Sequence, residues 1–181
     1  DEIEDLLRRA EKLIRDLKRK NDKLLKESEE LLERLRERAK EVLDESKKLL
    51  EELRELVRRR GKTEEIEELV KEINKRNREL LKELSDLVKE INERDKEVLD
   101  RLRRDHERTL KTIDDLLKEI RDERAARDVE RLKRRNKKVV EDSEDLARKT
   151  NKKSEELLRE IRKRVEDSNR ETKEILDRVR K

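Results

Sequence analysis

The stretch from residue 49 to residue 73 reads LLEELRELVRRRGKTEEIEELVKEI and contains Gly61, the single glycine of the chain. Three arginines come before this glycine, and Thr63 with two glutamates follows it. Cations suit the carbonyl end of a helix, acids suit its amino end, and a glycine just past a helix favours the left-handed conformation that ends it. We therefore predict a tight turn between two helices, with Gly61 left-handed and Thr63 as the N-cap.

On the N-terminal side of this turn, in the segment over residues 3–56, apolar residues recur at alternating spacings of three and four residues. A mean step of about 3.5 residues is the heptad repeat of a left-handed coiled coil, and the double step of four from Leu31 to Ala39 is a stutter. A second apolar residue often widens the stripe, which suits a helix packed against two neighbours. The predicted core positions of this segment are Ile3, Leu7, Ala10, Ile14, Leu17, Asn21, Leu24, Ser28, Leu31, Leu35, Ala39, Val42, Ser46, Leu49, Leu53 and Leu56.

Two further segments, residues 66–120 and 129–179, carry the same pattern, and the predicted core positions of the latter include Asn136 and Leu146. Three segments of equal length predict an all-α fold, an antiparallel up-down-up three-helix bundle with left-handed coiled-coil packing, and a single domain over residues 1–181. The predicted elements are helices over about 2–60, 64–121 and 128–180, with turns over 61–63 and 122–127.

The second turn carries the weaker signal, because residues 121–128 contain no Gly, Pro, Asn or Ser. Either Asp122 or Asp128 could cap the third helix. The rival interpretation is a continuous helix, which would place the third segment in another molecule as a domain swap.

Nearly every interruption of the apolar pattern is a small polar residue or histidine. Folding about Gly61 pairs positions whose residue numbers add to about 123, so Ser28 meets Asp95 and Ser46 meets Asn77. The third helix, running back along the second, pairs with it at a sum of about 247. The predicted members of buried polar networks are Asn21, Ser28, Ser46, Asn77, Asn92, Asp95, His106, Ser143, Thr150, Asn151, Ser154, Ser168, Asn169 and Thr172.

Such layers would fix the register of the helices. Leucine packs acceptably against leucine at many offsets, whereas a hydrogen-bonded layer satisfied at one alignment leaves buried, unpaired groups at every other. An unpaired buried polar group costs roughly 1–3 kcal/mol. The alternative interpretation is that these residues lie at the edges of thin rods and contact water.

The composition excludes several kinds of site. The chain has one histidine and no cysteine, so a site with two or three histidines, a Cys-based zinc site and a thiol nucleophile are all excluded within one chain. Arg103 stands where a Glu-x-x-His di-iron motif would need an acid before His106. We predict no catalytic, cofactor-binding or metal-binding residue and no cofactor.

Charged residues make up 60% of the chain, but 56 basic and 52 acidic side chains nearly cancel to a net +4. The run from Arg131 to Lys138 has six cations in eight residues, yet the chain lacks any aromatic residue that could stack on bases. We therefore expect no specific nucleic-acid binding. No apolar run approaches the roughly 18 residues of a membrane span, so we also expect no membrane contact, and a soluble product of a cytoplasmic expression host.

These features resemble de novo designed parametric helical bundles with buried hydrogen-bond networks. The resemblance covers the whole chain and rests on a core of Leu, Ile and Val, a surface of Glu, Lys and Arg, the Arg-Gly-Lys-Thr turn and the aligned polar layers. It implies a designed scaffold with no natural activity, monomeric and without a required partner. The alternative is a component of a designed homo- or hetero-oligomer, or a helix-binding module that completes a larger bundle.

Overall fold

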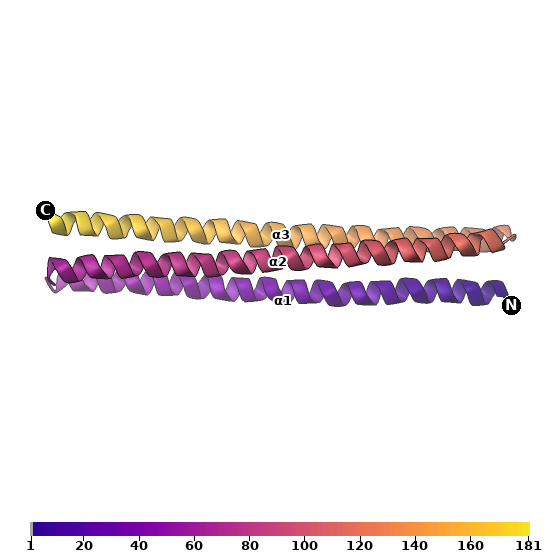
Figure 1. Cartoon of the computed structure of the whole chain (residues 1–181), viewed down its shortest axis with the longest axis horizontal. Helices are drawn as coiled ribbons and strands as arrows, with labels where there is room; N and C mark the ends of the chain where they lie inside the picture. Colours follow the sequence, from indigo (N-terminus) through magenta and orange to yellow (C-terminus); the bar gives the residue numbers. More distant parts are fainter. Residues whose placement is uncertain (1) are drawn as a thin grey trace. The chain divides into compact units, whose positions relative to one another are not determined.

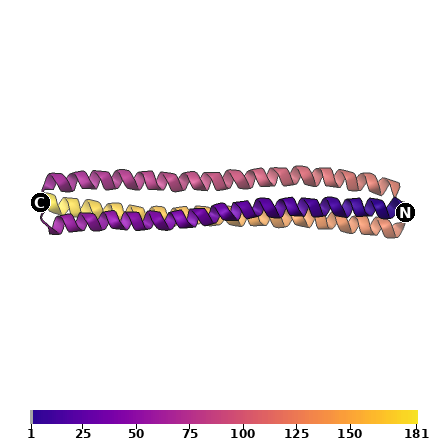
Figure 2. The same ribbon diagram turned by 90° about the horizontal axis from the view of Figure 1, so that it is seen from below.

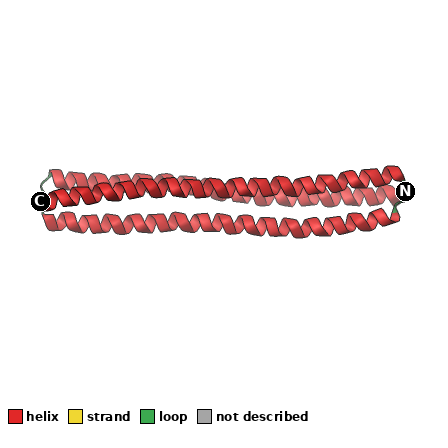
Figure 3. Cartoon of the chain, turned by 90° about the horizontal axis from the view of Figure 1, so that it is seen from above, coloured by secondary structure: helices red, strands yellow, loops and turns green. Residues whose placement is uncertain are grey.

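The computed structural model describes residues 2–181, apart from the side chain of residue 3, so the predicted core position Ile3 lies outside the described side chains. The chain forms three helices, α1 (Glu2–Arg58), α2 (Thr63–Glu119) and α3 (Glu123–Arg180), joined by two short loops (Figures 1 and 3). Each helix is amphipathic because its apolar residues recur with the helical period and therefore share one face. The predicted all-α fold of three long helices that pack against one another is confirmed.

The three helices contribute to two compact units. Unit 1 comprises Asp1–Glu30 and Asn92–Asn151, and unit 2 comprises Leu31–Ile91 and Lys152–Lys181. Within each unit, one segment of each helix takes part, and consecutive helices run in opposite directions (Figures 1 and 2). Each unit is thus by itself an antiparallel three-helix bundle, and the single domain proposed from the sequence stays a prediction.

Leu, Ile, Val and a few Ala fill the interior of both units. Unit 1 holds two clusters of buried apolar side chains, one of Ala10, Ile14, Ile113, Leu116, Ile120, Ala125, Val129 and Leu132, and one of Leu17, Val98 and Leu102. Unit 2 also holds two clusters, one of Leu32, Leu35, Ala39, Val42, Leu80, Leu84, Val88, Ile91, Ile161 and Val165, and one of Leu53, Ile66, Val70, Ile73 and Leu176.

One predicted core position is wrong. Leu146 was expected on the buried face of the third helix, but its exposed fraction is 42%, whereas the neighbouring Ala147 is only 1% exposed. The buried face of α3 passes through Val140 and Ser143 to Ala147. The spacing of large apolar residues therefore misplaces the buried face of α3 by one residue at this point.

The first turn ends α1 with a Schellman motif whose left-handed residue is Arg60, not Gly61. Arg60 has a φ of 56°. The Gly61 amide donates to the carbonyl of Leu56 at 3.0 Å, and the Arg60 amide donates to the carbonyl of Val57 at 3.1 Å, which are the two hydrogen bonds of that motif. Gly61 is needed for space, because a Cβ there would lie 2.6 Å from Leu56 Cδ1.

The predicted capping role of Thr63 is also wrong, since Thr63 is the first residue of α2 and the Lys62 carbonyl accepts the first helical hydrogen bond, from Ile66 at 3.1 Å. At the second turn Asp122 caps α3. Its carbonyl accepts the amide of Ala126 at 3.0 Å, and its carboxylate accepts the amide of Arg124 at 3.1 Å. Because Asp122 begins the helix, α3 starts at Glu123 and not near residue 128.

Candidate functional site: the buried polar residues

Ser28 and Asp95 form the polar layer that the sequence register predicted most directly. Both side chains are about 1% exposed, and the Ser28 hydroxyl donates a hydrogen bond to Asp95 Oδ1, joining α1 to α2 within unit 1. Burial raises the pKa of the Asp95 carboxyl, and the hydrogen bond from Ser28 partly opposes this. Asp95 Oδ2 has no hydrogen-bond partner among the described residues, so the ionised form is incompletely stabilised.

A second pair joins α1 to α3 in unit 1. Asn21 Nδ2 donates to the hydroxyl oxygen of Ser143, and that hydroxyl in turn donates to the backbone carbonyl of Val139 at 2.6 Å. Both polar side chains are buried, with exposed fractions of 2%. The hydroxyl of Ser143 acts as acceptor and donor at once, which is why a serine suits this place.

His106 completes a third contact in unit 1, with Asn136 of α3. Asn136 Nδ2 and His106 Nδ1 lie at hydrogen-bond distance, 2.8 Å apart. Asn136 is fully buried and His106 is half-buried. Asn136 is predicted from the sequence to lie on the buried face of the third helix, but it is not among the predicted members of a polar network. Its place on the buried face was the signal that it belongs to one.

In unit 2, the partner of Asn77 is Asn169 of α3. Asn77 Nδ2 donates to Asn169 Oδ1 at 2.7 Å. The predicted partner Ser46 is buried, with an exposed fraction of 3%, but its hydroxyl has no hydrogen-bond partner among the described residues. Glu45 and Arg76, the residues just before Ser46 and Asn77, form an ion pair at 2.6 Å, so the expected register of α1 and α2 is present without the expected hydrogen bond.

The threonines on the buried faces are satisfied within their own helices. Each donates its hydroxyl to the carbonyl four residues earlier, Thr109 to Asp105, Thr150 to Leu146 and Thr172 to Ser168. They therefore need no partner on another helix. Ser154 is buried like these threonines, whereas Asn92, Asn151, Ser168 and Asn169 are half-buried.

Interhelical ion pairs of α1 and α2 repeat one register. The partners are Glu27–Arg94 in unit 1 and Arg38–Glu83 and Glu45–Arg76 in unit 2, and in all three pairs the residue numbers add to 121. These interhelical ion pairs were not predicted from the sequence.

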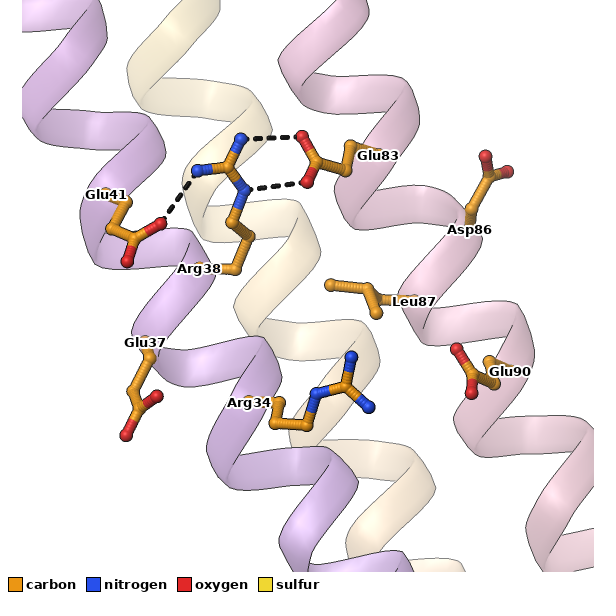
Figure 4. A pocket seen from close by; sticks show the side chains of 8 residues that line it. All are labelled: Arg34, Glu37, Arg38, Glu41, Glu83, Asp86, Leu87 and Glu90. Carbon is orange, nitrogen blue, oxygen red and sulfur yellow. Dashed lines mark hydrogen bonds and ion pairs between the residues drawn. The ribbon is translucent and has the colours of Figure 1, made fainter.

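The pair of Arg38 and Glu83 has two parallel hydrogen bonds, at 2.8 and 2.7 Å, and Arg38 also reaches Glu41 at 2.7 Å (Figure 4). Hydrogen bonding to these two carboxylates raises the pKa of Arg38, and Arg38 in turn lowers the pKa of Glu83. The three side chains border a cleft of about 370 Å³ in which acids outnumber cations.

A matching ladder joins α2 to α3, with partner numbers that add to 247, the sum expected from the sequence. Asp114 meets Lys133 at 3.1 Å and Glu144 meets Arg103 at 3.5 Å in unit 1, and Glu67 meets Arg180 at 3.1 Å in unit 2. These ion pairs are largely exposed, so each contributes little to the free energy of unfolding. Together they show how α2 and α3 are aligned within each unit.

Among the described residues, no cluster of three or more His, Asp or Glu side chains has the arrangement needed to hold a metal ion. No helix within residues 2–181 is both long and apolar enough to cross a membrane.

Comparison with known proteins gives information on the fold of the chain. No protein-family model matches the chain, and no curated protein matches it. A solved structure described as a computationally designed three-helix bundle is similar, with a TM-score of 0.50 and 17% sequence identity over 99% of this chain and 86% of that one. The chain therefore has a three-helix-bundle fold that a designed protein also adopts.

Proposed function

We propose that the chain is a designed structural scaffold with no natural biochemical activity, and that its buried polar residues specify the register of its helices. The likeness in fold to a designed bundle supports the design origin. So does a composition in which the core is built almost wholly from Leu, Ile and Val, without Pro, Met or any aromatic residue.

The hydrogen bond from Ser28 to Asp95 carries the proposal about register. At this alignment the buried serine and the buried carboxylate are hydrogen-bond partners. A slip of one heptad would place Ser28 against Val88 or Leu102, where its hydroxyl has no interhelical partner, at a cost of roughly 1–3 kcal/mol. Apolar side chains on the same faces would tolerate that slip with a smaller loss, so the polar pairs supply the specificity.

The test reads the register directly. Because the chain has no cysteine, Lys26→Cys and Lys96→Cys introduce two unique attachment points for spin labels on the exposed surfaces of α1 and α2 in unit 1. The distance distribution between the labels is then compared in the parent chain and in a variant that also carries Ser28→Leu and Asp95→Leu. We expect one narrow distribution in the parent and a broadened one in the variant, with helicity intact and stability unchanged or raised.

Ile113→Leu in the same labelled chain is the matched control, because it alters a buried side chain in unit 1 without removing a polar group. It should keep the narrow distribution. If the Ser28→Leu, Asp95→Leu variant keeps it too, the polar residues do not specify the register. If that variant loses most of its helicity, the residues have a structural role different from the one proposed.

As a second candidate, we propose a component of a larger assembly that buries apolar side chains left at the surface. Leu13 and Leu146, both in unit 1, have exposed fractions of 37% and 42%. Light scattering over a concentration series separates the two proposals. A constant mass of 22.2 kDa supports the self-contained scaffold, and a mass that rises to a multiple of it supports the assembly component.

A further inference from the structure

One cleft on unit 1, between α1 and α2, is lined by an excess of cations. It has a volume of about 490 Å³, and its cationic side chains are Lys20, Lys23, Arg94, Arg101, Arg104 and Arg108. Two acids, Glu27 and Asp105, also line it, so the local net charge is +4. We call this the cationic cleft.

The excess is a property of this place and not of the protein surface in general. The cleft beside Arg38 has two cations and five acids, and two clefts between α1 and α3 in unit 2 have three of each. Unit 1 as a whole has nearly equal numbers of acids and bases. The positive charge of the cationic cleft is therefore concentrated locally.

Most cations of this cleft form no ion pair with a described residue. Arg94 is paired with Glu27 across the helices and with Glu97 on its own helix. Among the described residues, the other five cations of the cleft form no ion pair within 4.0 Å. In the same unit, by contrast, Asp114 of α2 pairs with Lys133 of α3 at 3.1 Å.

The register of α1 and α2 places a like-charged pair in this cleft. Lys20 and Arg101 have numbers that add to 121, as in the ion pairs Glu27–Arg94 and Arg38–Glu83. Lys20 and Arg101 thus occupy the position one heptad from Glu27 and Arg94, where opposite charges would be expected to meet. An anion bound between Lys20 and Arg101 would supply the negative charge that is missing at this position.

The remaining lining favours an extended phosphate anion. Arg101, Arg104 and Arg108 follow one another at helical spacing on a single stripe of α2, with forked donors that match phosphate oxygens. The lining also includes Leu102, which is 2% exposed, so part of the cleft surface is apolar. We propose that the cationic cleft binds a small linear oligophosphate of the tripolyphosphate class, whose several charged oxygens reach Lys20 and the arginine stripe together.

Isothermal titration of the full chain with sodium tripolyphosphate at low ionic strength tests the proposal. We expect one bound anion per chain, an affinity that falls as sodium chloride is added, and a loss of about tenfold or more in the variant Arg101→Gln, Arg104→Gln. The matched control is Arg170→Gln, Arg178→Gln, which removes two arginines of one helix from a cleft of balanced charge. Circular dichroism of both variants verifies that helicity is unchanged, so that loss of binding is not loss of fold.

Three results would overturn the proposal. The first is no measurable binding to the parent chain, and the second is an equal loss in the control variant, which would mean diffuse attraction to surface arginines. The third is tighter binding of a single-stranded oligothymidylate of equal charge, which would assign the cleft to a nucleic-acid backbone. We expect the oligothymidylate to bind more weakly, because the chain has no aromatic side chain on which bases could stack.

Discussion

Unit 1 and unit 2 are nearly equal in length but fill their interiors differently. Among the described side chains, unit 2 buries sixteen apolar residues, of which one is alanine, and four polar ones. Unit 1 buries fourteen apolar residues, of which three are alanine, and seven polar ones. The same three helices thus supply an interior rich in branched aliphatic side chains in one unit and an interior with more hydrogen-bonding groups in the other.

The difference corresponds to two requirements of a helical bundle, namely stability and a defined alignment of its helices. Burial of a Leu, Ile or Val side chain contributes about 1.5–3 kcal/mol, whereas a buried hydrogen bond contributes only about 0.5–1.5 kcal/mol net. Under the proposed function, polar pairs such as Ser28–Asp95 and Asn21–Ser143 would specify alignment at some loss of stability. We therefore expect unit 2, which buries more aliphatic side chains, to be the more stable of the two units.

The largest effect is expected from a charge placed in the interior of unit 2. Leu84 is fully buried in the main apolar cluster, so Leu84→Asp should lower the free energy of unfolding by several kcal/mol, of order 4. Chemical denaturation followed by circular dichroism measures the loss. Leu13→Asp, at a partly exposed position, is the control and should cost less than about 1 kcal/mol. A neutral Leu84→Asp would mean that the buried face is wrongly identified.

Native-state hydrogen exchange compares the two units directly. Because unit 2 buries more branched aliphatic surface, its slowest backbone amides should exchange about tenfold or more slowly than the slowest amides of unit 1. Amides near Ile73 and Leu84 report on unit 2, and amides near Leu17 and Ile113 report on unit 1. Equal protection in both units would show that hydrogen-bonded layers stabilise as effectively as apolar packing.

A smaller effect is expected at the buried carboxyl of unit 1. Because burial raises the pKa of Asp95 in the folded chain above its unfolded value, the stability linked to this group is fully present below the unfolded pKa, near 3.9, and is lost as the pH rises through the folded pKa. Asp95→Asn removes the ionisation while retaining polar groups that can bond to Ser28. It should raise stability at neutral pH by about 1 kcal/mol.

Urea denaturation of the parent and the Asp95→Asn variant from pH 3 to pH 7 measures that difference. The advantage of the variant should grow with pH, and the comparison between chains cancels the other carboxyls, which are common to both. An advantage that is independent of pH would show that the pKa of Asp95 is the same in the folded and the unfolded chain, which would contradict a pKa raised by burial.

The smallest effect is expected at the turn of unit 2. Arg60 adopts a left-handed conformation that costs a residue with a side chain roughly 1–2 kcal/mol, and glycine avoids this cost but gains freedom in the unfolded chain. Arg60→Gly should therefore raise stability by about 0.5 kcal/mol, seen as a small increase in the thermal midpoint. The turn of unit 1 has a carboxylate cap instead, so Asp122→Ala should lower stability by about 1 kcal/mol. A destabilising Arg60→Gly would contradict this account of the turn.

The helices and their alignment could be predicted from the sequence because each depends on a period repeated many times. The sum of about 247 for α2 and α3 recurs in three ion pairs, and Ser28 bonds to Asp95 as expected. One wrong position, such as Leu146, does not disturb a pattern supported by many others. The fold class therefore follows from the sequence with little ambiguity.

Features that depend on a single side chain could not be predicted in the same way. Whether Asn77 turns to Ser46 or to Asn169 depends on rotamers within a layer of three helices, which the register leaves open. The residue types favour Gly61 for the left-handed position, yet Arg60 takes it. The cationic cleft escaped notice because its charges come from two helices, whereas a run such as Arg131 to Lys138 is visible in one.

The ion pairs Arg38–Glu83 and Glu45–Arg76 are separated by seven residues on each of their two helices. Seven residues of α-helix span about 10.5 Å. Inserting one further heptad of the same kind at matching levels of α1, α2 and α3 would lengthen unit 2 by that amount and leave every existing partner in place. Unit 2 can accordingly be lengthened in whole heptads, with an interhelical ion pair marking each step.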